Sequence, residues 1–133
     1  MIQNYQFIIT LYWIFVETDF EASHRLTFAD GTQEHLHSHR WHVMAAVGAA
    51  SLNAQGLVMD FLELKQLLDE VVEPLSGQEL ETLPWFSETN ASAEAVARSL
   101  FGALAGRIRP PARLGYIEVA EAPGCRARFE LDA

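Results

Sequence analysis

The sequence predicts an α+β fold, in which two β-hairpins form a four-stranded antiparallel sheet and two helices are inserted between them. Three observations predict it. Apolar, alternating segments lie near both ends of the chain, two helical patterns lie in the middle, and turns containing Gly or Pro separate them. The chain has 133 residues, which suits one domain with a real core and is too short for two. We therefore expect a single domain over residues 1–133.

The first strand is predicted within Phe7–Val16, a continuously apolar stretch. This stretch is too short to span a bilayer as a helix, no basic residue precedes it, and no small-residue cleavage site follows it, so a strand is favoured over a signal sequence. Its β-branched and aromatic residues favour burial on both faces, as in a barrel or an oligomer interface. The return strand is predicted over Trp41–Leu52, after a polar loop.

Two amphipathic helices are predicted next, over Met59–Leu75 and Ser92–Ile108. Asp60 is the expected N-cap of the first helix, and Ser92 or Asn90 that of the second. Between them, residues 76–90 read as a loop. Its expected apolar anchors are Leu80, Leu83, Trp85 and Phe86.

The last two strands are predicted over residues 114–122 and 125–133, around a turn at Pro123 and Gly124. Four strands leave two exposed edges, which a chain of this size can hardly cover. We therefore expect a homo-oligomer formed by extending the sheet.

Charge and cysteine content narrow the possible partners. Eighteen acidic and nine basic residues give a formal charge of -9, which argues against broad binding to nucleic acid or to anionic membranes. Small molecules and protein partners remain open. The single cysteine, Cys125, excludes an intrachain disulfide and fits a reducing, cytoplasmic location.

All histidines of the chain fall between residues 24 and 42, and they are His24, His35, His37, His39 and His42. On a strand, residues 37 and 39 point to the same face, and residue 24 could reach that face across the hairpin. Three converging imidazoles with an open fourth position form a catalytic zinc site in many enzymes. Spacing alone leaves open which three converge, and the segment could also be a solvated loop. By parity, His42 points to the opposite face.

Several motifs occur in a characteristic order: FEASHRL, HSH, GLVMDFLELK, a helix opening with SAE, and IEVAE in a late strand. With them, the chain from Phe20 onward resembles the 6-pyruvoyltetrahydropterin synthase and 6-carboxytetrahydropterin synthase family. The resemblance implies the tunnelling fold (T-fold), in which hairpins of three subunits close a barrel and two trimers stack. It also implies a lyase that acts on 7,8-dihydroneopterin triphosphate or a related dihydropterin.

The resemblance also assigns roles to residues. His24, His37 and His39 match the three zinc-binding histidines of the family. Glu121 matches the glutamate that accepts hydrogen bonds from the pterin ring and its amino group. The implied cofactor is therefore Zn²⁺, the implied small-molecule partner is a pterin, and the implied assembly is a trimer or hexamer.

Two departures from the family pattern affect the chemistry. The family has a catalytic cysteine shortly before the His-x-His pair, where this chain has Asp30–Leu36 without cysteine. The family's Asp-His pair after the first helix is replaced by Ser76 and Gly77. Cys125, in the last hairpin, does not substitute for the missing thiol.

Two interpretations follow from these departures. In one, Glu34 is the base, with His35 or His42 as partner, and the enzyme is a synthase or a lyase that cleaves the side chain to a 6-hydroxymethyl dihydropterin. In the other, the chain is a non-catalytic zinc- and pterin-binding relative. The sequence leaves open the substrate, the product and the pathway, which could concern folate, biopterin or deazapurine nucleosides.

Overall fold

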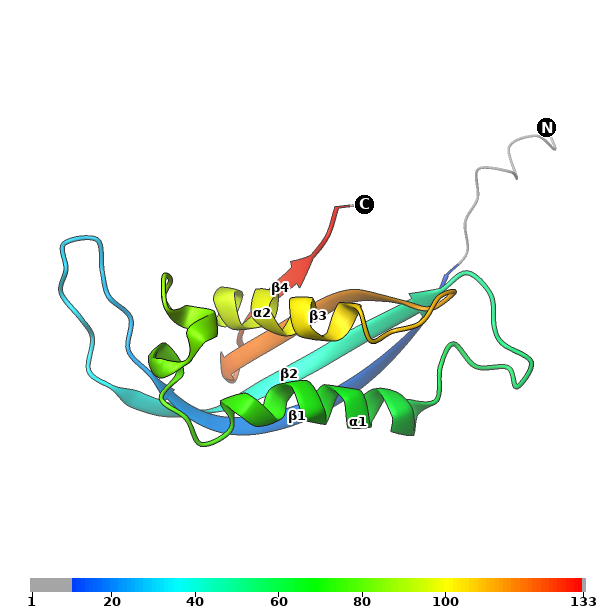
Figure 1. Cartoon of the computed structure of the whole chain (residues 1–133), viewed down its shortest axis with the longest axis horizontal. Helices are drawn as coiled ribbons and strands as arrows, with labels where there is room; N and C mark the ends of the chain where they lie inside the picture. The colour runs from blue at the N-terminus through cyan, green and yellow to red at the C-terminus, as the bar shows by residue number, and fades with distance from the viewer. Residues whose placement is uncertain (1–10, 133) are drawn as a thin grey trace.

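The computed structural model describes residues 11–132 and confirms the α+β fold. Within these residues the strands are β1 (Tyr12–His24), β2 (His37–Ala49), β3 (Arg113–Ala122) and β4 (Cys125–Glu130), and the α-helices are α1 (Phe61–Val72) and α2 (Ala93–Ala105). Three short 3-10 helices lie between α1 and α2: η2 (Glu73–Leu75), η3 (Leu80–Thr82) and η4 (Pro84–Phe86). The strands form one antiparallel sheet in the order β1-β2-β3-β4, and both α-helices cover the same face (Figure 1).

The two strands of the first hairpin lie closer together in the chain than the sequence predicts. Part of the predicted strand Phe7–Val16 lies outside the described residues, and β1 continues to His24. The return strand was predicted too late, because β2 begins at His37 and ends at Ala49. Charged and apolar residues alternate after Val16, and this is the pattern of a strand buried on one face only. Pairing of His24 with His37 closes the hairpin ladder at the end that carries the histidines.

The core lies between the sheet and the two helices. Trp41 on β2 is fully buried, its ring stacks on Phe20 of β1 with centroids 5.8 Å apart, and its Nε1 donates a hydrogen bond to the Ala22 carbonyl at 3.1 Å. Leu64 of α1 and Leu100 of α2 are also fully buried against the sheet. This aromatic pair lies next to the histidines on the same face of the hairpin, so its packing in the core fixes that end of the hairpin.

The helix caps are the predicted ones. The Asp60 carboxylate accepts a hydrogen bond from the Leu62 N–H at 2.8 Å, and the Ser92 hydroxyl accepts one from the Ala95 N–H at 3.1 Å. Both helices are shorter than predicted. α1 gives way to η2 after Val72, where Pro74 follows, and α2 ends at Ala105.

The segment between the helices contains no α-helix, as predicted. It does contain short 3-10 helices, which the sequence did not predict. Leu80 and Phe86 are buried as expected, and Leu83 is packed against the core. Trp85 is 40 % exposed, so the expectation that it anchors the loop is wrong. Its neighbour Phe86 fills the core position instead.

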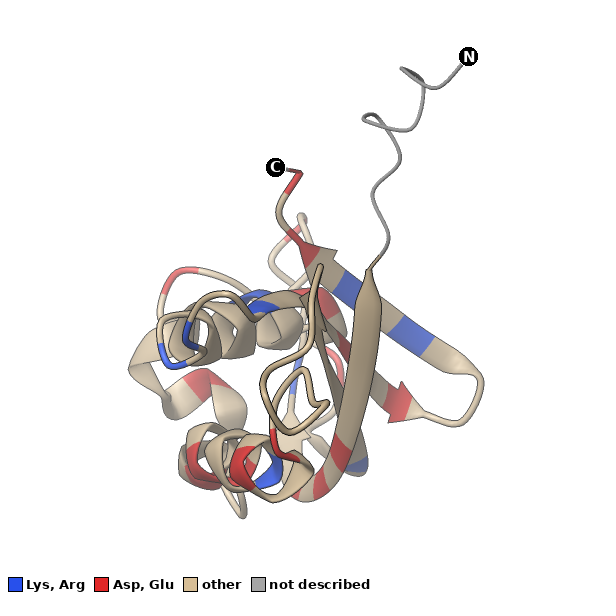
Figure 2. Cartoon of the chain, turned by 90° about the vertical axis from the view of Figure 1, so that its right-hand side faces the viewer, with Lys and Arg blue, Asp and Glu red and all other residues tan. Residues whose placement is uncertain are grey.

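The two sheet edges are β1 and β4. Tyr12, Trp13 and Phe15 on β1 are 49 %, 37 % and 46 % exposed, so within a single chain this strand is not buried on both faces. Charge is distributed unevenly: acidic residues gather on α1, and β4 carries arginines (Figure 2). Among residues 11–132 there is no helix of sufficient length and apolarity to cross a membrane.

Candidate metal centre

Three histidines converge where the first hairpin ends. His24 is the last residue of β1, and His37 and His39 are the first and third residues of β2. Each offers a ring nitrogen, and these three atoms lie within 4.8 Å of one another. The register pairs His24 with His37 and Ala22 with His39, which places all three imidazoles on the helix-covered face. The structure therefore selects from the five histidines a trio that could hold a metal ion.

Backbone carbonyls orient two of these rings. The Nδ1 of His24 lies 2.8 Å from the Ala91 carbonyl oxygen, and the Nδ1 of His37 lies 2.7 Å from the His35 carbonyl oxygen. A carbonyl only accepts hydrogen bonds, so Nδ1 of each ring carries the proton and Nε2 presents a lone pair. This is the usual arrangement for histidines that bind a metal.

The site fits a zinc ion. Nε2 of His24 is buried and has no hydrogen-bond partner, although buried polar atoms are normally satisfied. A metal ligated by this nitrogen would account for the unsatisfied atom, and three imidazoles are a donor set that Zn²⁺ accepts. Burial lowers the pKa of His39 below 6.5, and the neighbouring imidazoles add to the effect against the opposing charge of Glu121. A lowered pKa keeps the ring neutral, which is the form that binds metal.

Two carboxylates border the trio. Oε2 of Glu121, on β3, lies 3.3 Å from Nε2 of His24, and Oε1 of Glu34 lies 3.8 Å from Nε2 of His37. Oε1 of Glu34 also accepts a hydrogen bond from the Leu26 N–H at 3.0 Å. The structure thus brings Glu34 and Glu121 to the same three histidines. Three imidazoles and two carboxylates therefore meet in one place.

The other candidates lie elsewhere. Cys125 is exposed and begins β4, where it lines a cavity on the sheet face opposite the helices. Gly77 donates its N–H to the Glu21 carbonyl at 2.7 Å, and with Ser76 it borders a cavity beside Asp19 and Arg40. None of these side chains belongs to the histidine cluster.

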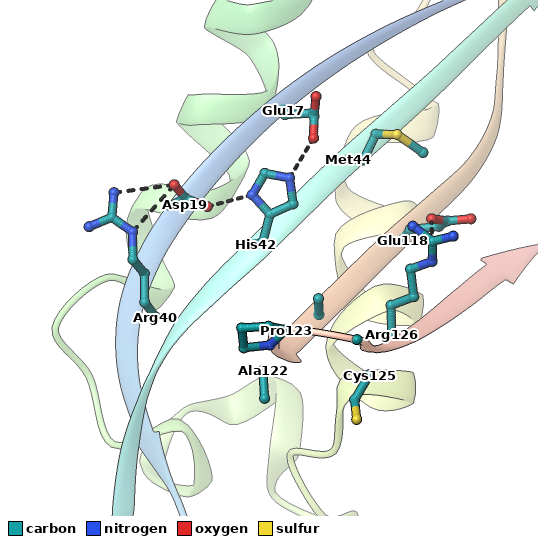
Figure 3. Close-up of a pocket in the computed structure, with 12 residues that line it drawn as sticks. Glu17, Asp19, Arg40, His42, Met44, Glu118, Ala122, Pro123, Cys125 and Arg126 are labelled. Carbon is teal, nitrogen blue, oxygen red and sulfur yellow. Dashed lines mark hydrogen bonds and ion pairs between the residues drawn. The ribbon is translucent and has the colours of Figure 1, made fainter.

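His42 lies on the open face of the sheet, as parity predicts (Figure 3). Its Nδ1 is 2.5 Å from Oδ1 of Asp19, and its Nε2 is 2.5 Å from Oε1 of Glu17. Arg40 pairs with the other oxygen of Asp19 at 3.2 Å. These residues line a cavity of about 600 Å³ that is separate from the histidine trio. His42 therefore does not act as the partner of Glu34, and this part of the expectation was wrong.

The cluster around His42 makes stability depend on pH. Hydrogen bonds to Asp19 and then Glu17 raise the pKa of His42 above 6.5, while the bond from His42 and then that from Arg40 hold the pKa of Asp19 below 3.8. The His42 contribution is complete below its unfolded pKa and is lost as pH rises through the raised value. The Asp19 contribution is present above about pH 4 and is lost as pH falls through the lowered value.

We expect the chain to lose stability as pH rises above neutrality, and the variant His42→Gln to show less of this loss. Urea midpoints measured from about pH 5 to about pH 9 would test it, since the stability difference between the two proteins should shrink with rising pH. A difference that stays constant across this range would contradict a raised pKa of His42 in the folded protein.

Comparison with known proteins identifies the fold and the family. The family model for 6-pyruvoyl tetrahydropterin synthase matches residues 13–132. The chain belongs to the 6-pyruvoyl tetrahydropterin synthase family. A search of the curated proteins finds no match.

Solved structures agree with the family on the fold. The 6-pyruvoyl tetrahydropterin synthase of Caenorhabditis elegans superposes with a TM-score of 0.81 at 18% identity, covering 93% of this chain and 98% of that one. That of Plasmodium vivax gives 0.74 at 18% identity, with 93% and 99% covered. An uncharacterized protein from Wolinella succinogenes gives 0.71 at 22% identity, with 92% and 99% covered. These similarities confirm the subunit fold of the T-fold, a four-stranded antiparallel sheet with two helices.

The sequence did not reveal what holds the histidine site in place. The Ala91 carbonyl that orients His24 is a backbone atom 67 residues away, so no residue type marks it. The side chains that fix the neighbouring loop, Glu81 and Asn90, were likewise missed. Their partners are backbone groups far away in the sequence, and local patterns carry no signal for such contacts.

Proposed function

We propose that this chain is a zinc-dependent lyase that acts on 7,8-dihydroneopterin triphosphate or a related dihydropterin. Membership of the 6-pyruvoyl tetrahydropterin synthase family supports a pterin synthase-like function. The observation that carries the proposal is the three-histidine cluster bordered by Glu34 and Glu121. Its buried, unsatisfied His24 Nε2 is a group that metal binding would satisfy.

In this proposal, His24, His37 and His39 hold the zinc. A zinc ion bound by three imidazoles supplies a Lewis acid that polarises an oxygen of the substrate. The backbone carbonyls of Ala91 and His35 keep the first two rings in the tautomer that this requires.

Glu121 is proposed to bind the pterin ring. As a carboxylate it only accepts hydrogen bonds, so it suits adjacent ring N–H and amino donors. It extends from β3, whose pairing with β2 carries it toward the histidine cluster. Recognition of the ring at Glu121 would direct the pterin side chain toward the zinc.

Glu34 is proposed as the base. The N–H of Leu26 occupies Oε1 and thereby orients the carboxylate, while Oε2 remains to take a proton. In side-chain cleavage, this oxygen would take the proton of the 2′ hydroxyl while C2′ becomes an aldehyde carbonyl and the C1′–C2′ bond breaks. The electron pair of that bond would pass to C1′ and the pterin ring, the proton would return to C1′, and the fragment that contains C2′ would leave as an aldehyde. One structure similar to this chain is a catalytic-residue mutant of the Plasmodium vivax synthase in which a glutamate is replaced by alanine. A glutamate thus has a catalytic role in that protein.

The alternative is a non-catalytic protein that binds zinc and pterin. Its support is the absence of the family's Cys and Asp-His residues at the matching positions. Ser76 and Gly77, which stand in place of the pair, lie beside β1 and Arg40.

The proposed assembly is a homo-oligomer, either a trimer or a hexamer. The sheet edges are β1 and β4 within the described residues. The last residues of β1 already hydrogen-bond to residues 77–78, but its first half has no further strand beside it and exposes Tyr12, Trp13 and Phe15. Exposed aromatic residues along an edge strand favour pairing with another subunit. The cytoplasmic location stays a prediction.

Metal analysis and product analysis together test this function. The purified protein, prepared without chelator, is expected to contain about one zinc per chain. The zinc form is then incubated with 7,8-dihydroneopterin and with its triphosphate, and pyruvoyl, carboxy or hydroxymethyl pterins are sought. Absence of metal would refute the zinc site. Pterin binding without any turnover would favour the non-catalytic alternative.

A further inference from the structure

The segment between α1 and α2 runs alongside the last residues of β1 and the residues that follow it. The Ser23 N–H donates to the Gln78 carbonyl at 2.9 Å, and Ser23 forms an isolated parallel bridge with Glu79. In Figure 1 this segment lies beside the end of the β1–β2 hairpin, next to its long connecting loop. The same segment continues to Ala91, whose carbonyl accepts the hydrogen bond from His24. This segment is therefore in a position to hold the end of β1 and the His24 ring in place.

The Glu81 side chain connects the residue after β1 with the residue before α2 that holds His24. Its Oε1 accepts the Arg25 N–H at 3.0 Å, and its Oε2 accepts the Ala91 N–H at 3.3 Å. Arg25 directly follows His24 in the chain, and Ala91 holds the ring of His24. The Glu81 carboxylate thus binds the residue next to His24 and also the residue whose carbonyl orients the His24 ring.

Asn90 holds the loop that carries Glu34. Its Oδ1 accepts the Thr27 N–H at 2.9 Å, and its Nδ2 donates to the Thr27 carbonyl at 3.0 Å. Thr27 forms an isolated antiparallel bridge with Gln33, and the Glu34 N–H donates to the Leu26 carbonyl at 3.0 Å. The N–H of Leu26 in turn binds the Glu34 carboxylate. Asn90 therefore acts on Glu34 through the strand-like pair of residues 26–27 and 33–34.

We propose that Glu81 and Asn90 are positioning residues with separate targets: Glu81 orients the metal ligand His24, and Asn90 places Glu34. The inference rests on the proposed function for its chemical meaning. Both side chains bind backbone groups more than 50 residues away, since the separations are 56 residues for Glu81 and 63 for Asn90. They fix the connection between β1 and β2. Over residues 25–36 this connection contains no helix and no strand, and its bridges are isolated.

The Glu81 part is tested by zinc affinity. Outer groups that orient zinc ligands change affinity by about 10- to 100-fold, and we expect Glu81→Ala to weaken zinc binding by about tenfold, at the low end. Glu81→Gln should lie between this variant and the wild type, because its amide has one oxygen acceptor where the carboxylate has two. Chelator competition gives the affinity, and the visible spectrum of the cobalt-substituted protein reports a change in ligand geometry.

Glu79→Gln is the matched control, because Glu79 binds Thr82 through its backbone carbonyl, which the substitution keeps. Equal zinc affinity and an equal cobalt spectrum in folded Glu81→Ala and wild type would overturn the role of Glu81. If the wild type itself binds no zinc, the proposed function fails, and the positioning role fails with it.

The Asn90 part is tested by whether loss of this side chain lowers turnover without weakening zinc binding. Asn90→Ala is expected to lower kcat by about tenfold, since small displacements of a reacting group are costly, while KM and zinc affinity stay near wild type. Asn90→Asp keeps the acceptor for the Thr27 N–H and should recover part of the loss. A parallel loss of zinc affinity and kcat would indicate general loosening and refute the separate role.

Hydrogen exchange tests the same link without turnover. The Leu26 amide, which binds the Glu34 carboxylate, is expected to exchange faster in Asn90→Ala than in the wild type, while the Leu62 amide at the start of α1 is expected to be unchanged. Unchanged exchange at Leu26 would show that Asn90 does not hold the Glu34 loop, whether or not the protein is catalytic.

Discussion

Substitution of His37 by alanine is expected to weaken zinc binding by more than about 100-fold, because even the outer partners of a ligand contribute about 10- to 100-fold. His37 supplies one of the three ring nitrogens of the proposed zinc site, and its side chain is 36% exposed, so its loss should leave the core intact. Chelator competition and metal content after dialysis measure the effect. Circular dichroism and the urea midpoint establish that the variant is folded.

His35→Ala is the matched control. His35 lies two residues away, its side chain is outside the cluster, and its backbone carbonyl still accepts the hydrogen bond from His37 after the change. This variant should bind zinc as the wild type does. Equal losses in both variants would mean that the metal is held by the loop in another way.

Substitution of Glu34 by glutamine is expected to lower kcat by about 10²- to 10⁴-fold, the range typical of a general base. The amide oxygen can still accept the Leu26 N–H, so the loop should keep its conformation. An amide cannot take a proton at neutral pH, however. Turnover of dihydroneopterin and its triphosphate, measured at saturating substrate, gives the effect, and zinc content should not change.

Glu88→Gln controls for the loss of one negative charge, because Glu88 is an exposed residue of the segment before α2. It should retain wild-type turnover. If Glu34→Gln also retains it, another group removes the proton, and Glu121 is the next carboxylate beside the trio at 3.3 Å from His24. Glu121→Gln would then separate a role in proton transfer from a role in pterin binding.

Much of the fold is predictable because it follows from local patterns. The caps at Asp60 and Ser92 were recognised from residue type and position, since a short oxygen-bearing side chain at that place satisfies free backbone N–H groups. The start and end of the first hairpin were not. Residues beyond Val16 are charged on one face, and their extended conformation depends on pairing with β2 rather than on their own propensity.

The sequence by itself determined the pattern of faces in the candidate site. Side chains alternate along a strand, so His37 and His39 share a face and His42 points away, and the family motifs single out His24 as their partner. Only the tertiary structure decided what surrounds the trio. The Ala91 carbonyl accepts a hydrogen bond from the His24 ring 67 residues away, and Glu81 and Asn90 bind backbone groups 56 and 63 residues away. Each of these bonds involves a backbone group, which every residue possesses. Contacts of this kind depend on the path of the chain and leave no periodic signal in the sequence.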